Sequence, residues 1–217
     1  MAQILVLAAL SEEADALFSG AGEYGGALFA ERRLAVGGHS LTIATCGLGK
    51  VHAALCAGMF GADADMLLMT GTCGALGAAP GAYWIAEAVQ HDYGAAQPGL
   101  FQRYRAGEWP IGEPGEAHFT AMPDPGLGLP HARIASGDSF VACPDAAAGL
   151  AQHLGASLVD MEVGAIAQVG ARLGKPWAAI KAVTDDANDA SGGDFHTNLR
   201  RAARLAAGEI ERLVVML

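Results

Sequence analysis

The sequence has little positive charge. It contains 13 lysines and arginines against 23 aspartates and glutamates, which gives a net charge of −10. An acidic chain repels the phosphate backbone of nucleic acids, so nucleic acid is not expected as a partner. The one local basic cluster is Arg200, Arg201 and Arg204, and because it lies in a helical pattern we interpret it as a solvated face.

Long apolar runs are also missing, although 52% of the residues are hydrophobic. No run approaches the roughly 18 residues that a membrane span needs. The apolar start of the chain has neither a basic flank nor an A-x-A cleavage site, and we interpret it as a buried strand rather than a signal peptide. The sequence therefore predicts no membrane association.

Cysteines are few, and their spacing is not that of a metal site. No two of the four cysteines form a CxxC motif, and each lies among apolar or glycine residues; they are Cys46, Cys56, Cys73 and Cys143. We interpret them as buried thiols in a reducing cytoplasm, with disulfides or a metal as minor alternatives.

Apolar segments of strand length recur along the chain, with helical segments between them. The expected strands are 3–10, 40–46, 65–71, 83–89, 132–137, 156–161 and 177–183, and a weaker candidate, 28–36, could pair with 40–46 as a hairpin. The first expected helix follows Ser11, which is its expected N-cap. The other expected helices are 50–60, 144–154, 161–173 and about 198–216. This pattern predicts a single α/β domain over residues 1–217, with a mixed, mostly parallel central sheet flanked by helices.

Residues 91–130 interrupt this pattern. They hold most of the nine prolines and many glycines, together with the aromatic residues Phe101, Tyr104, Trp109 and Phe119. The stretch is too long for a simple connection, so it is either a flexible lid or a segment that packs on a partner subunit. A variable surface insertion is the alternative.

Polar or glycine-rich segments follow several expected strands, at the edge where α/β sheets form their sites. Glu12 and Glu13 follow the first strand, although acidic residues in a first helical turn can simply favour the helix dipole. Residues 46–54 and 71–77 are glycine-rich exits at which backbone N–H groups can approach a ligand.

Two further segments place carboxylates at strand ends. Asp160 and Glu162 lie where a strand becomes a helix, so they either cap that helix or bind sugar hydroxyls, since a buried carboxylate needs partners. Asp185 follows the strand 177–183 and is either part of a polar turn or a general acid whose pKa is raised by its surroundings.

Taken together and in this order, these segments resemble one family. The chain is similar, from residue 3 to about 215, to the purine nucleoside phosphorylase/uridine phosphorylase superfamily, and within it to the 5′-methylthioadenosine/S-adenosylhomocysteine nucleosidases. The segment DMEVGAIAQV (160–169) resembles the V-E-M-E-x-x-A-I-A signature and is the most specific match. The other matching segments are ALSEEADAL (9–17), CGLGKVHAA (46–54), MTGTCGALG (69–77), VQHDYGA (89–95), SGDSFV (136–141) and TDDAND (184–189).

The resemblance implies an enzyme that cleaves the N-glycosidic bond of an adenine nucleoside in the cytoplasm, as part of methionine salvage, without a metal or organic cofactor. It places Glu13 on the glutamate that activates water and Asp185 on the aspartate that protonates purine N7. Glu162 falls on the glutamate that binds the ribose 2′- and 3′-hydroxyls. The other implied substrate contacts are Met161 beside the sugar, Phe140 stacked on the base, Val141 at the adenine edge, and Cys73 and Gly74 at the glycine-rich exit.

The resemblance also implies a homodimer. The similar nucleosidases are dimers with a shared pocket, so part of 91–120 is expected to close the partner's pocket. Leu100 or Phe101 is the candidate for the residue lent to the partner.

The sequence leaves three alternative functions to weigh. Phosphorylases of the superfamily carry arginines that hold phosphate, but the first junction here has none and Met69 stands at the position of the second arginine. Hydrolysis is therefore favoured over phosphorolysis. A nucleosidase for another 5′-modified adenine nucleoside, such as adenosylhopane, is a further possibility, whereas Asp185 disfavours futalosine. A non-enzymatic nucleoside-binding protein would not require three carboxylates.

Overall fold

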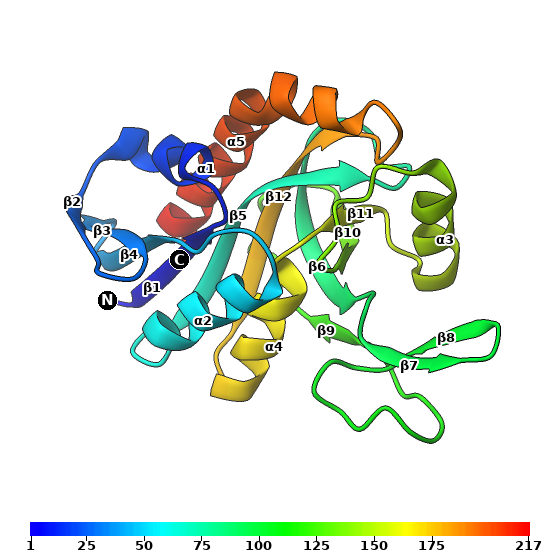
Figure 1. The fold of residues 1–217 in the computed structure, drawn as a ribbon. Coiled ribbons are helices and arrows are strands. Elements are labelled where there is room, and N and C mark those ends of the chain that lie inside the picture. Colours follow the sequence, from blue (N-terminus) through cyan, green and yellow to red (C-terminus); the bar gives the residue numbers. More distant parts are fainter.

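Twelve strands and five α-helices make up the fold, in a computed structural model that describes residues 1–217 (Figure 1). The strands are β1 (Gln3–Ala8), β2 (Glu23–Gly25), β3 (Ala30–Val36), β4 (His39–Thr45), β5 (Met66–Ala75), β6 (Ala82–Gln90), β7 (Gly94–Gln97), β8 (Leu100–Arg103), β9 (His118–Thr120), β10 (His131–Ser136), β11 (Leu158–Asp160) and β12 (Trp177–Asp185). The helices are α1 (Ser11–Ala16), α2 (Lys50–Gly61), α3 (Pro144–Leu154), α4 (Val163–Leu173) and α5 (Ser191–Met216), together with a short 3₁₀ helix, η1 (Leu17–Gly20).

Ten of the strands form one mixed sheet. Their order is β11-β10-β6-β12-β5-β1-β4-β3-β2, and β9 pairs with β6. The central neighbours β12, β5, β1 and β4 are parallel, whereas the predicted β3–β4 hairpin is antiparallel. β11 pairs with both β10 and β5, so that β5, β12, β6, β10 and β11 close into a ring. The predicted α/β fold with a mixed central sheet is confirmed.

The core lies on both faces of this sheet. Along β1, Ile4 and Val6 pack with the α5 side while Leu5 and Leu7 pack with α2 and α4, because successive side chains of a strand point to opposite faces. Figure 1 shows the same layers, with α1 and α5 on one side of the sheet and α2 and α4 on the other. Burial of each large aliphatic side chain contributes about 1.5–3 kcal/mol, so the apolar strand runs account for the central position of the sheet.

Several predicted boundaries were wrong. Ser11 is not the N-cap of α1: Leu10 holds that position, and the side chain of Glu13 accepts the N–H groups of Ala9 and Leu10. Helix α5 begins at Ser191 rather than 198, and continues through Gly192 and Gly193. The exposed arginines 200, 201 and 204 lie on its outer face, as predicted. No helix in the structure has the length and apolar character required to span a membrane.

The predicted burial of the cysteines is confirmed for three of the four. Cys46, Cys56 and Cys73 are buried and all four thiols are free. Cys143 is exposed, so its predicted burial was wrong. It is the N-cap of α3, in extended backbone directly before Pro144.

The segment 91–130 is partly ordered into strands. The β7–β8 hairpin forms a separate two-stranded sheet that extends away from the main body (Figure 1), and β9 joins the main sheet. Tyr104 and Phe119 are buried, so they do not belong to an exposed apolar patch. Leu100 and Trp109 are exposed, by 54% and 78%.

Candidate active site

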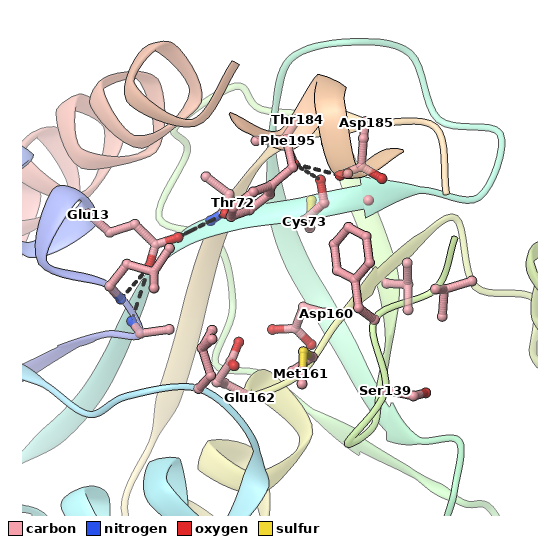
Figure 2. A pocket seen from close by; sticks show the side chains of 18 of the residues that line it. Glu13, Thr72, Cys73, Ser139, Asp160, Met161, Glu162, Thr184, Asp185 and Phe195 are labelled. Atoms are coloured by element: carbon pink, nitrogen blue, oxygen red, sulfur yellow. Dashed lines mark hydrogen bonds between the residues drawn. The ribbon is translucent and has the colours of Figure 1, made fainter. Parts of the chain in front are cut away.

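A pocket of about 480 Å³ lies where β1, β5, β11 and β12 end (Figure 2). Its walls come from segments far apart in the sequence, which the sheet brings to one edge as expected for α/β folds. The pocket is lined by all eight residues that the sequence singled out, namely Glu13, Cys73, Gly74, Phe140, Val141, Met161, Glu162 and Asp185.

Four hydrogen bonds hold the carboxylate of Glu13. Its Oε2 accepts the backbone N–H groups of Ala9 and Leu10, at 3.0 and 3.1 Å. Its Oε1 accepts the N–H and the hydroxyl of Thr72, at 2.8 and 2.9 Å. Only 2% of Glu13 is exposed, so these donors replace bulk solvent around the carboxylate, which still lines the pocket. Gly71 makes room for it, because a Cβ at that position would lie 2.8 Å from Oε1.

A buried ion pair lies beneath the pocket. The Lys181 Nζ atom is 3.0 Å from Oδ2 of Asp160 and 3.8 Å from Oε2 of Glu162. Burial lowers the pKa of Lys181, but Asp160, Glu162 and Glu13 together raise it above its ordinary value, so the ammonium stays charged. A charged lysine under the pocket holds the two carboxylates in place and partly neutralises them.

Asp160 and Glu162 have different tasks in the fold. Oδ2 of Asp160 accepts the N–H of Val163 at 3.0 Å, so Asp160 caps α4 as one interpretation of the sequence had it. Oε1 of Glu162 accepts the N–H of Gly49 at 2.9 Å. Burial raises the pKa of Glu162 to about 7, against the opposing charge of Lys181 and with a further increase from Asp160.

Asp185 ends β12 on another wall of the pocket. Its Oδ1 accepts the N–H of Ala187 at 3.0 Å, and its Oδ2 accepts the hydroxyl of Thr184 at 2.8 Å. The side chain is buried, and Gly74 leaves space beside it, since a Cβ there would lie 3.2 Å from Oδ1. Figure 2 shows Glu13, Glu162 and Asp185 entering the pocket from three separate elements.

An aromatic ring pair forms another part of the wall. Phe140 is 51% exposed, and its ring meets that of Phe195 edge to face, with centroids 6.1 Å apart. The segment that carries Phe140 is tied to α2, because Oδ1 of Asp138 accepts the N–H of Lys50 at 2.7 Å. Asp92 completes this tie: it accepts the N–H of Asp138 at 2.9 Å and pairs with the Lys50 ammonium at 2.6 Å.

Sequence reasoning missed some residues of the site. Thr72 lies within a glycine-rich exit that was recognised, but its contact with Glu13 depends on the pairing of β1 and β5. Lys181 is hidden in an apolar strand, where an isolated lysine is itself the signal. Phe195 and His196 line the pocket from the first turns of α5. The sequence did not predict a helix there, because Gly192 and Gly193 come just before them and glycine disfavours helix.

Four carboxyl groups, of Glu13, Asp160, Glu162 and Asp185, line the pocket together with nine hydrophobic residues. A concave site of this mixed character at the end of an α/β sheet is typical of an enzyme that acts on a small molecule with polar and apolar parts. The model of the phosphorylase superfamily matches residues 3–215 of the chain. The 5′-methylthioadenosine/S-adenosylhomocysteine nucleosidase of Mycobacterium tuberculosis is 30% identical over 212 residues, which cover 82% of each chain. That of Treponema pallidum is 30% identical over 218 residues, with 83% of this chain and 81% of the relative covered.

A solved structure agrees with these relatives. The 5′-methylthioadenosine/S-adenosylhomocysteine nucleosidase from Neisseria meningitidis, in complex with methylthio-immucillin-A, is 25% identical with a TM-score of 0.86 and is covered over the whole of both chains. The chain belongs to the phosphorylase superfamily and, within it, to the nucleosidases.

Proposed function

We propose that this enzyme hydrolyses the N-glycosidic bond of 5′-methylthioadenosine, S-adenosylhomocysteine and similar adenine nucleosides, releasing adenine. The observation that carries the proposal is the meeting of three buried carboxylates, Glu13, Glu162 and Asp185, in one pocket with an aromatic wall. The names of the similar nucleosidases support the same reaction.

In this proposal Asp185 is the general acid at the base. Adenine leaves poorly as an anion, so protonation at N7 by a carboxylic acid is needed to make it a neutral leaving group. Phe140, half exposed at the wall, stacks on the purine ring. Val141, Cys73 and Gly74 line the same pocket and contact the base, with backbone groups at Val141 reading its edge.

Glu162 and Glu13 act on the sugar side. Glu162 accepts hydrogen bonds from the ribose 2′- and 3′-hydroxyls, and Met161 packs beside the sugar. Hydrogen bonds from the two hydroxyls favour the ionised carboxylate, and therefore lower the raised pKa of Glu162 when substrate binds. Glu13 orients and activates the attacking water, and the negative charges of both glutamates favour the oxocarbenium-like sugar of the transition state.

Hydrolysis rather than phosphorolysis is supported by the lining of the pocket, which includes neither arginine nor lysine. Met69, at the position of a phosphorylase arginine, is completely buried in β5. We expect the purified enzyme to release adenine equally fast in phosphate-free and phosphate-containing buffer, with free methylthioribose as the second product. Chromatography of adenine, with a reducing-sugar assay, measures both products. Dependence on phosphate, with a ribose 1-phosphate as product, would instead identify a phosphorylase.

We also propose that the enzyme is a homodimer in which part of 91–120 closes the partner's pocket. The support is apolar surface: Val51, Leu55 and Met59 form an exposed stripe along α2, at 76%, 47% and 48% exposure. Exposed apolar residues gathered on one face mark an interaction site. Leu100, with Phe101 beside it, stays the candidate for the residue lent to the partner.

Light scattering at micromolar concentration is expected to give twice the chain mass of 22.1 kDa. The double variant Val51→Glu/Leu55→Glu should be monomeric and much less active, because two charges replace the apolar centre of the interface. Leu205→Glu, which changes an exposed leucine on α5, is the matched control and should stay dimeric. A fully active monomer would rule out the shared pocket.

We further propose that the enzyme acts in the cytoplasm, as part of methionine salvage. Four free cysteines, three of them buried, suit a reducing compartment. Fractionation of the cells that make this protein would test the location.

A further inference from the structure

The segment that carries Phe140 and Val141 is fixed at few points. Residues 139–142 lie between β10 and α3, outside any helix or strand, and make no hydrogen bond to the rest of the chain. The nearest hydrogen-bonded residue after Phe140 is Cys143, whose carbonyl accepts the N–H of Ala147 at 3.0 Å. The nearest one before it is Asp138, only two residues away. The position of Phe140 therefore depends on how Asp138 is held.

Lys50 closes a ring of polar contacts around Asp138. Its backbone N–H donates to Oδ1 of Asp138 at 2.7 Å, and its ammonium lies 2.6 Å from Oδ1 of Asp92. Oδ2 of Asp92 in turn accepts the N–H of Asp138 at 2.9 Å. Burial acts to raise the pKa of Asp92, but the Lys50 ammonium and the Asp138 N–H together hold that pKa below its usual value, so the carboxylate stays ionised. The ring joins α2, the turn after β6 and the segment that carries Phe140.

The same end of α2 also holds the carboxylate proposed to bind ribose. The N–H of Gly49, the residue before Lys50, donates to Oε1 of Glu162 at 2.9 Å. Consecutive N–H groups of the chain thus hold Glu162 and Asp138. In the function proposed above, the start of α2 therefore sets the position of the base-binding segment relative to the ribose-binding carboxylate.

We infer that Lys50 is a positioning residue for the base: its ion pair with Asp92 holds Asp138, and through Asp138 the ring of Phe140, in place to stack on the purine. The inference rests on the proposed function, which puts the base against Phe140. Stacking stabilises the bound substrate and the transition state alike, so loss of the ion pair should raise KM and leave kcat nearly unchanged. The side chains of Lys50 and Asp92 are 17% and 33% exposed, so the ion pair is only partly shielded from water. The effect should be modest, about three- to tenfold in KM.

The test compares Lys50→Met with Lys50→Arg, with methylthioadenosine as substrate. Methionine keeps a long flexible side chain without its charge, so KM should rise about three- to tenfold while kcat stays within about twofold of wild type. Arginine can still pair with Asp92, so Lys50→Arg should keep a KM close to that of wild type. Lys175→Met, which changes a lysine whose ammonium has no partner in the structure, is the matched control and should keep the wild-type KM.

Asp92→Ala removes the same ion pair from the other side. The Lys50 ammonium also donates to Oε1 of Gln90 at 3.3 Å, and Asp92→Ala leaves that contact in place. This variant should raise KM at least as much as Lys50→Met, because it also removes the acceptor of the Asp138 N–H. Thermal melting checks that each variant is folded, and if Lys50→Met is unfolded at the assay temperature, Asp92→Ala carries the same test.

A double variant shows whether the ion pair acts through Phe140. Phe140→Ala alone should raise KM, because the stacking is lost. If Lys50 acts by placing that ring, adding Lys50→Met, or Asp92→Ala in its place, to Phe140→Ala should raise KM little further, whereas independent effects would multiply. The full product of the two single effects in the double variant overturns the inference.

The remaining outcomes separate this inference from the proposed function. A wild type that releases adenine from methylthioadenosine, with a KM that neither Lys50→Met nor Asp92→Ala changes, overturns the role of Lys50 alone. A loss confined to kcat in these variants does the same, since stacking would then not be what the ion pair supports. A wild type that releases no adenine overturns the proposed function, and this inference with it.

Discussion

Asp185→Asn is expected to lower adenine release by about 10²–10⁴-fold, the usual contribution of a general acid. An amide has no acidic proton to give to N7, so the base would have to leave as an anion. The fold should tolerate the change, because an asparagine oxygen can still accept the N–H of Ala187, and Thr184 can turn its hydroxyl to the carbonyl of Cys73, 3.1 Å away.

The neighbouring Asp186 provides the control for this experiment. It is exposed, carries the same charge and is changed by the same substitution, so Asp186→Asn should retain wild-type activity. Thermal melting of both variants checks that they are folded. If Asp185→Asn keeps activity within about threefold of wild type, the loss is too small for a general acid, and Asp185 does not have that role.

Glu13→Gln should remove hydrolysis by a similar factor while the variant still binds nucleoside. Glutamine cannot act as a base towards water, yet it leaves the groups proposed to hold purine and ribose untouched. The substitution should also lower the melting temperature. Four donors surround the carboxylate, and the amide nitrogen of glutamine cannot accept from two of them, at a cost of about 1–3 kcal/mol for each unpaired donor.

Glu12→Gln is the matched control, since Glu12 is exposed on the same helical turn and should be replaceable without effect. Turnover follows adenine release, and calorimetry with methylthioadenosine follows binding. If Glu13→Gln turns substrate over at the wild-type rate, or loses binding while turnover persists, Glu13 is not the base.

The order of the longer strands was accessible from the sequence because most of them are apolar runs. The strands β2, β7, β8 and β9, with three or four residues each, were not predicted. The β3–β4 hairpin was predicted from two neighbouring segments of strand length, and in the structure Gly37 and Gly38, both with positive φ, make the turn between them. The closure of the sheet was not, because the antiparallel pairing of β11 with β5 joins segments more than 80 residues apart in sequence and has no local signal.

The site shows the same division. Glu162 and Asp185 stand at strand ends, where a carboxylate is conspicuous, and their motifs were recognisable. Lys181 and Phe195 were missed for opposite reasons. A lysine that is buried against Asp160 looks like an isolated polar residue in a strand, and Phe195 follows two glycines that argue against the helix it belongs to.

The surroundings of Glu13 also determine how this enzyme tolerates mutation. Three of the four donors to its carboxylate are backbone N–H groups, of Ala9, Leu10 and Thr72, and backbone groups survive almost every change of side chain. Residues 9 and 10 can therefore vary during evolution without removing the donors, except to proline. Position 71 has no such freedom: with φ at +141° and the carboxylate 2.8 Å from where a Cβ would be, it accepts only glycine.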